Sequence, residues 1–123
     1  MNKIHRGHIA ELYVLDQLQK RGCFPLRRNY RGIGFEIDLI MGKGACLYFV
    51  EVKYRAKLDP DILGNIESLC SYKKRQSLQK GASHFLTYSN QTDPTTAVTY
   101  RIDLALVTGP FNNLKLSYFP GID

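Results

Sequence analysis

The stretch EIDLIMGKGACLYFVEVK, residues 36–53, decides the fold of this chain because it carries acidic side chains inside two apolar runs. Asp38 interrupts the first run, and Glu51 interrupts the second run two residues before Lys53. Residues i and i+2 of a strand lie on the same face, so Glu51 and Lys53 are expected to point together. The pattern therefore predicts two strands that each place charge on a largely apolar sheet.

Two glycines within Met41–Cys46 predict a tight connection, which would fold the runs back as a hairpin and bring Asp38, Glu51 and Lys53 together. Carboxylates on an apolar sheet are costly to desolvate unless they pair or hold an ion. Mg²⁺ and similar hard cations prefer carboxylate oxygens. We therefore expect Asp38 and Glu51 to bind Mg²⁺ or Mn²⁺, with Lys53 orienting or helping to deprotonate a metal-bound water. The alternative is an ordinary Glu–Lys pair on a solvent-exposed face.

A third acidic residue lies in the helix predicted over Ile4–Arg21. At 100° per residue Glu11 falls inside the apolar arc of this helix, so it faces the core. It could reach the sheet and help to bind the metal. It could instead form a buried ion pair with Arg27, Arg28 or Lys53.

The other elements follow from periodicity and from capping and turn residues. They are a strand over Phe24–Tyr30, a helix over Tyr72–Tyr88 capped by Ser71, a strand over Thr99–Val107 and a last strand over Leu114–Phe119. The polar segments 56–64 and 90–97 predict loops, and the first could act as a substrate flap. The order of helix, three strands, helix and two strands is typical of an α/β fold around a mixed sheet, and 123 residues suit a single domain over 1–123.

The chain has a formal net charge of +6 and a pI near 9.3, which favours a polyanionic partner such as nucleic acid. Guanidinium groups bind phosphate oxygens bidentately, and lysines in the first turn of a helix lie where anions are favoured. The residues expected to contact nucleic acid are Arg27, Arg28, Arg31, Arg55, Lys73 and Lys74. The alternatives are a solvated charge run for the arginines and a lysine that extends to water for Lys74.

Three cysteines without a C-x-x-C pair indicate neither a disulfide framework nor a zinc site. The N-terminal residues lack the apolar core of a signal peptide, and no run approaches the roughly 18 apolar residues of a membrane helix. We therefore expect a cytoplasmic protein.

Several motifs follow one another along the chain: Glu11 with its apolar helix, RRNYR at 27–31, EIDLI at 36–40 and FVEVKYR at 49–55. In this ordered set the chain resembles the YraN-like family of small bacterial proteins. That family is similar to archaeal Holliday-junction resolvases and belongs to the PD-(D/E)xK, restriction-endonuclease-like superfamily. The resemblance implies a restriction-endonuclease-like core and a metal held by Glu11, Asp38 and Glu51 with Lys53 assisting. The chain has Ala10 and Phe35 where the family usually has glycine.

The function expected from these observations is Mg²⁺-dependent hydrolysis of phosphodiester bonds in structured or branched DNA. The competing function is a non-catalytic nucleic-acid-binding protein. A further alternative is an accessory subunit of a DNA-processing complex, based on the small size of the domain and on expected exposure of Tyr118 and Phe119 near the C-terminus. The expected partner is branched or duplex DNA, and a two-fold substrate such as a four-way junction would suit a homodimer.

Overall fold

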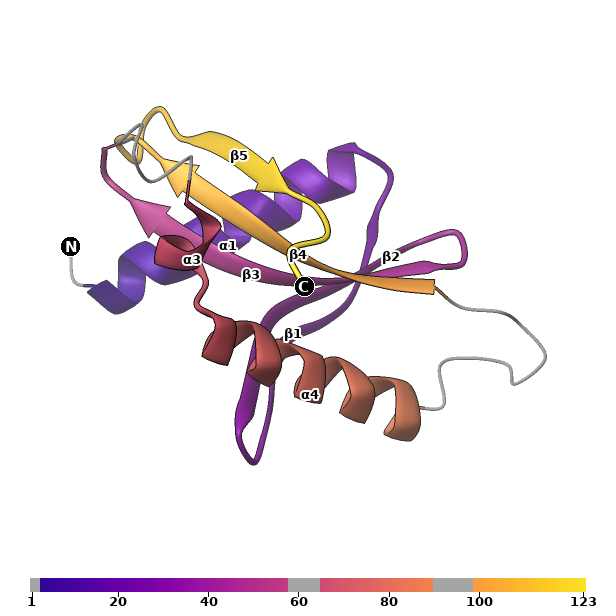
Figure 1. Cartoon of the computed structure of the whole chain (residues 1–123). Helices are drawn as coiled ribbons and strands as arrows, with labels where there is room; N and C mark the ends of the chain where they lie inside the picture. Colours follow the sequence, from indigo (N-terminus) through magenta and orange to yellow (C-terminus); the bar gives the residue numbers. More distant parts are fainter. Residues whose placement is uncertain (1–2, 58–64, 90–98) are drawn as a thin grey trace.

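The computed structural model describes residues 3–57, 65–89 and 99–123, and in it helices pack on one β-sheet (Figure 1). The elements are α1 (Lys3–Lys20), β1 (Phe24–Gly32), β2 (Phe35–Lys43), β3 (Cys46–Arg55), α3 (Ile66–Leu69), α4 (Tyr72–Tyr88), β4 (Thr99–Thr108) and β5 (Lys115–Phe119). The predicted order is confirmed. Only the short helix α3 was not predicted, because four residues are too few to show a helical period.

The strands form one mixed sheet in the order β1-β2-β3-β4-β5. Strands β1, β2 and β3 are antiparallel neighbours, β4 runs parallel to β3, and β5 is antiparallel to β4. A parallel pair needs a long crossover connection, which here contains α3 and α4. The predicted α/β architecture around a mixed sheet is therefore confirmed.

The helices α1 and α4 cover opposite faces of the sheet (Figure 1). Strand alternation separates the core into two layers, as the neighbours Phe49 and Val50 illustrate. Phe49 packs in the layer on the α4 side with Leu78 and Phe85, whereas Val50 packs with Val14 of α1. Each face of β3 is thus buried, which explains its almost continuous apolar sequence.

The connection between β2 and β3 is shorter than predicted. Lys43 pairs with Cys46, so the turn consists of Gly44 and Ala45 alone, and the predicted Met41–Cys46 connection was too long. Gly44 has φ +60, which a two-residue hairpin turn requires and glycine supplies without steric cost. The predicted strand over Phe24–Tyr30 is longer in the structure, so Arg31 lies within β1.

Helix α4 has the predicted bounds and cap, because Ser71 Oγ accepts a hydrogen bond from the Lys74 backbone N–H at 3.1 Å. The expected exposure of the C-terminal aromatic residues was wrong. Tyr118 and Phe119 are partly buried against the core, and the Tyr118 hydroxyl donates to the buried Asp103. This removes one of the two grounds for the accessory-subunit alternative, and the small size of the domain remains.

The three cysteines are free thiols, and of these Cys70 is buried and the others partly buried. The predicted loop over 90–97 and most of the predicted flap over 56–64 lie outside the described residues. Among the described helices, none is both long and apolar enough to cross a membrane.

Candidate functional site

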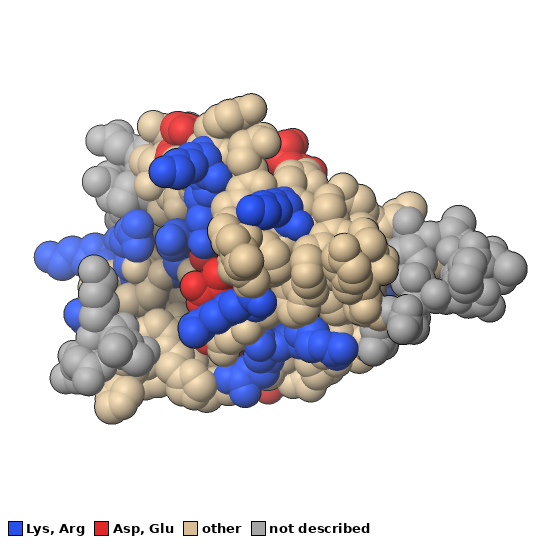
Figure 2. Space-filling view, turned by 90° about the horizontal axis from the view of Figure 1, so that it is seen from below, with Lys and Arg blue, Asp and Glu red and all other residues tan. Residues whose placement is uncertain are grey.

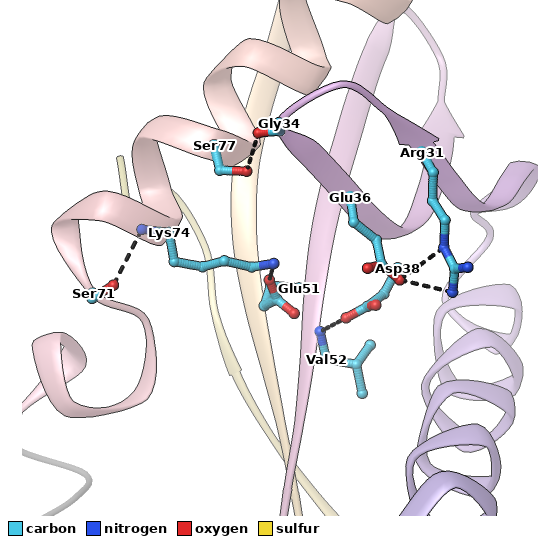
Figure 3. A network of polar contacts seen from close by, with 9 residues as sticks. All are labelled: Arg31, Gly34, Glu36, Asp38, Glu51, Val52, Ser71, Lys74 and Ser77. Atoms are coloured by element: carbon cyan, nitrogen blue, oxygen red, sulfur yellow. Dashed lines mark hydrogen bonds and ion pairs between the residues drawn. The ribbon is translucent and has the colours of Figure 1, made fainter.

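Asp38 lies at the point where β2 separates from β3. The ladder between these strands starts at the pair Leu39 and Val50, and its continuation would place Val52 opposite Ile37. Instead, the Val52 backbone N–H donates to Asp38 Oδ2 at 2.8 Å (Figure 3). The carboxylate thus replaces the missing backbone acceptor and satisfies an N–H that would be left unpaired in the interior. This bond holds Asp38 against β3.

The backbone at this point departs from regular alternation. Ile37 packs in the layer on the α4 side and Leu39 in the layer on the α1 side, although residues two apart in a regular strand share a face. Opposite Asp38 in the register of β1 lies Asn29, whose φ is +52. Asparagine is among the few residue types that tolerate this left-handed conformation. Asn29 therefore lies beside Asp38 at the point where the alternation of β2 is irregular, and the sequence reasoning did not identify it.

Glu51 is the most buried of the three predicted metal ligands, with 4% of its surface exposed. Its side chain points from β3 toward Lys74 of α4, and Oε2 lies 3.1 Å from Lys74 Nζ (Figure 3). The two atoms form an ion pair, and Oε2 has no other hydrogen-bond partner among the described residues. Burial and the nearby Asp38 raise the pKa of Glu51 to about 8, against the opposing effect of Lys74 and Lys53.

Glu11 approaches the Asp38 carboxylate from α1. It is partly buried, and burial together with the charge of Asp38 raises its pKa to about 7, while Arg28 acts in the opposite direction. Both predicted roles of Glu11, metal ligand and ion-pair partner of Arg28, therefore stay open, because Asp38 and Arg28 both act on its charge. Arg27 is on the other side of the strand, with its guanidinium 5.8 Å from the Phe85 ring centroid.

Lys53 follows Glu51 on the same face of β3 and is partly buried, and its charge lowers the pKa of Glu51. The negative charge of Glu51 in turn acts to raise the pKa of Lys74. Burial lowers the pKa of Lys74, but Glu51 and Asp38 outweigh this and raise it above its ordinary value. The structure thus gathers three carboxylates from α1, β2 and β3 and two ammonium groups from β3 and α4.

Of the six residues predicted to contact nucleic acid, two already form ion pairs with acidic side chains. Lys74 belongs to the carboxylate cluster, and Arg31 forms a surface ion pair with Glu36 at 3.0 Å. The other four, Arg27, Arg28, Arg55 and Lys73, are exposed. Figure 2 shows acidic atoms in a hollow with lysine and arginine side chains around it. A basic rim around an acidic centre is suited to a polyanion that approaches a bound cation.

Sequence reasoning placed Lys74 in the first turn of the helix over Tyr72–Tyr88 but did not pair it with Glu51. The available signal was its spacing of four and eight residues from Leu78 and Ala82, which are buried on α4. The partner could not be identified without the placement of α4 on the sheet. Glu36 lies in the EIDLI motif, and the sequence predicted no role for it. Its charge nevertheless acts to raise the pKa of both Glu11 and Lys74.

The donor set suits a hard divalent cation. Among the described residues, no three His, Cys, Asp or Glu side chains form a ready-made cage for a metal. Mg²⁺ does not need one, since it commonly binds through one or two carboxylates and keeps several waters. The charge of Asp38 acts to raise the pKa of both Glu11 and Glu51, so the three carboxylates lie close together. The buried Oε2 of Glu51 still has a lone pair that a metal could use. These oxygens fit Mg²⁺ or Mn²⁺ better than a soft metal.

Comparisons with known proteins place this chain in a family. A model described as "Uncharacterised protein family UPF0102" matches residues 10–107, which include Glu11, Asp38, Glu51 and Lys53. A UPF0102 protein of Photobacterium profundum is 30% identical over 115 residues, covering 94% of this chain and 88% of the relative. A UPF0102 protein of Neisseria meningitidis serogroup C is 35% identical over 104 residues, covering 85% and 84%. One of Legionella pneumophila is 31% identical over 109 residues, covering 89% and 87%. The chain therefore belongs to the uncharacterised protein family UPF0102.

Proposed function

We propose that this protein is a Mg²⁺-dependent endonuclease that hydrolyses phosphodiester bonds of structured or branched DNA on a restriction-endonuclease-like core. The observation that carries the proposal is the convergence of Glu11, Asp38 and Glu51 from three separate elements, with Lys53 beside Glu51. The element order, the antiparallel hairpin β2–β3 and the parallel strand β4 support the core that the resemblance implies.

Electrostatics supports a cation at this point. Like-charged carboxylates in a partly dry site oppose each other's ionisation, which is why the pKa values of Glu11 and Glu51 are both raised. A divalent cation would reverse this penalty, because its charge favours the ionised form of every ligand. A scaffold gains little from such an arrangement, whereas perturbed acids gathered in a hollow are typical of a functional site.

The residues of the chain have separable tasks in this proposal. Asp38 is held by the Val52 N–H, so its second oxygen is available to the ion. A bound Mg²⁺ would act as a Lewis acid toward the scissile phosphate. Lys53 offsets negative charge that develops on the phosphate under attack. Lys74 partly compensates the charge of Glu51. The exposed arginines on the rim attract and orient the DNA backbone.

One observation favours a second candidate function. The ion pair between Lys74 and Glu51 already compensates the most buried carboxylate without a metal. A non-catalytic nucleic-acid-binding protein would use this pair to stabilise the fold and would keep the basic rim for phosphate contacts.

Metal-dependent cleavage separates the two candidates. We expect the wild-type protein to cleave a four-way junction, a flap or a duplex in Mg²⁺ or Mn²⁺, and Asp38→Asn, Glu51→Gln and Lys53→Ala each to abolish cleavage. The two carboxylate variants should bind DNA in metal-free buffer as well as wild type or better, since they remove negative charge. Lys53→Ala should retain Mg²⁺ binding, because an ammonium group has no lone pair for a metal.

Lys115→Ala provides the control, since Lys115 is an exposed lysine on β5 outside the carboxylate cluster. It should cleave at the wild-type rate. A wild-type protein that binds DNA tightly but cleaves none of these substrates in either metal would favour the binding-protein candidate.

A further inference from the structure

The tip of the β1–β2 hairpin presents one apolar side chain to solvent. Gly32 pairs with Phe35, so the turn consists of Ile33 and Gly34, and Gly34 adopts φ +80. Ile33 is 91% exposed, more than any other large apolar residue described. Isolated exposed apolar residues are common, so exposure alone assigns no role.

The tip is held in place from the adjacent helix. Ser77 Oγ of α4 donates to the Gly34 carbonyl at 3.0 Å, a contact drawn in Figure 3. Lys80 of α4 packs over the same glycine, where an added Cβ would lie 2.7 Å from its Nζ. On the other side of the turn, Phe35 is buried and stacks on Tyr30 with ring centroids 5.7 Å apart. Ile33 is thus projected by a braced turn, and its exposure is a fixed feature of the fold.

The surroundings of Ile33 suit DNA. The β1–β2 hairpin projects beyond the sheet (Figure 1). Ile33 precedes Asp38 by five residues, so the tip lies up to about 16 Å along the strand from the carboxylate cluster. Its neighbours Arg31 and Lys80 are exposed and basic, and glycines flank it in sequence. One apolar side chain within a basic surface is too small for a stable protein interface, whereas apolar wedges between base steps are normally accompanied by phosphate-binding cations.

We infer that Ile33 is a wedge that inserts into the base stack of DNA at a branch point, where stacking is already interrupted, and so favours branched over continuous duplex DNA. The inference rests on the proposed nucleic-acid function of the neighbouring site. The basic neighbours bind the backbone, the braced turn keeps the side chain extended, and insertion of the side chain separates neighbouring bases. Ile33 acts as a specificity-determining residue and takes no part in the bond-breaking step.

Base unstacking can be measured without cleavage. A four-way junction with 2-aminopurine at the branch point is titrated with protein in buffer containing EDTA, and the fluorescence rise that accompanies unstacking is recorded. Wild type should give a rise. Ile33→Ser should lose most of it and should lose about tenfold of the preference for junction over duplex. Ile33→Leu keeps apolar bulk and should retain both. Leu12→Ser, at another exposed apolar position on α1, should behave as wild type.

The outcomes distinguish the wedge from the nuclease. An unchanged fluorescence rise in Ile33→Ser, or no rise with wild type bound to the junction, overturns the wedge whether or not Mg²⁺-dependent cleavage occurs. A rise that depends on Ile33 without cleavage in Mg²⁺ or Mn²⁺ supports the wedge and counts against the endonuclease. Failure of wild type to bind any DNA overturns both. Circular dichroism and urea unfolding should show Ile33→Ser to be folded, because the side chain makes no core contact.

Discussion

At the residue scale, burial distinguishes the two glutamates of the site. Glu51 is almost completely covered and lies between Asp38 and Lys74, whereas Glu11 is partly open to solvent. The pKa is raised to about 8 for Glu51 and about 7 for Glu11, with burial the largest cause in both. Ionisation of either glutamate therefore lowers the free energy of unfolding of the metal-free protein, and this effect can be measured.

Glu51→Gln should change the pH dependence of stability. A carboxyl whose pKa is higher in the folded than in the unfolded state holds more protons when folded, so stability falls as pH rises from about 4.5 toward 8. The variant cannot ionise and lacks this fall. Without metal, wild type should lose on the order of 3 kcal/mol relative to Glu51→Gln between pH 5 and pH 9, as measured by urea unfolding.

Glu67→Gln is the control, because the backbone N–H of Tyr72 and the Arg75 guanidinium lower the pKa of the exposed Glu67. A carboxyl whose pKa is lower in the folded than in the unfolded state stabilises the fold above its ordinary pKa of 4.5. This contribution is lost only as the pH falls below that value. The difference between wild type and Glu67→Gln should therefore be constant from pH 5 to pH 9. If the stability difference between wild type and Glu51→Gln is also constant from pH 5 to pH 9, Glu51 is not buried as described.

Glu11→Gln tests whether this residue is a ligand or a structural ion-pair partner of Arg28. A ligand should lose Mg²⁺ affinity when its charge is removed, with the stability of the metal-free protein at pH 8 unchanged or improved. Calorimetric Mg²⁺ titration and urea unfolding measure the two effects. If the variant is instead destabilised by about 3–5 kcal/mol, as loss of a buried pair would predict, with Mg²⁺ binding unchanged, the role of Glu11 is structural.

At the scale of the elements, the contact of α4 with β2 places Lys74 near Glu51. Gly81 lies in the buried stripe of α4, and a Cβ there would meet Ile37 Cδ1 at 2.8 Å and Phe35 Cδ1 at 2.9 Å. The missing side chain allows the helix to approach the strand closely. This close approach allows Lys74, about two turns earlier in the helix, to reach Glu51 on β3.

Gly81→Ala should destabilise the protein even though alanine favours helix formation. Overpacking of this contact should cost about 1–3 kcal/mol in urea unfolding. Gly7→Ala is the matched control on α1, where an added Cβ meets no described atom within 4 Å. It should stabilise the protein by up to about 1 kcal/mol, since only the helix propensity changes. Equal effects at both positions would contradict the close packing of α4 on β2.

At the scale of the whole molecule, the excess of positive charge is distributed around the acidic hollow in the view of Figure 2. Each phosphate that a protein neutralises releases counterions and contributes about 0.9 to the slope of log affinity against log salt. Arg27, Arg28, Arg55 and Lys73 are exposed, and Lys74 and Arg31 would have to leave their present partners to contribute.

Binding of a DNA duplex or junction should therefore weaken with salt at a slope between about −3.5 and −5.5, for four to six phosphate contacts. Fluorescence anisotropy from 50 to 250 mM salt measures it. Lys73→Ala should reduce the magnitude of the slope by about 1 and weaken all DNA substrates alike. Affinity that does not change with salt would remove the electrostatic argument for a nucleic-acid partner.

Local patterns were sufficient to predict most of the fold. The end of α1 before Gly22, the Ser71 cap of α4 and the strands β3 and β4 depend on residues near one another in sequence, and all were predicted closely. The acidic interruptions at Asp38 and Glu51 were visible for the same reason, since they break an apolar period.

The sequence by itself thus determined the elements other than α3, their order and the acidic residues that distinguish this sheet. Tertiary structure alone decided how those residues meet: the bond from Val52 to Asp38 and the pairing of Glu51 with Lys74. These contacts depend on strand register and on the distance at which α4 packs. Register and packing arise from contacts between residues distant in the chain, which no local period encodes.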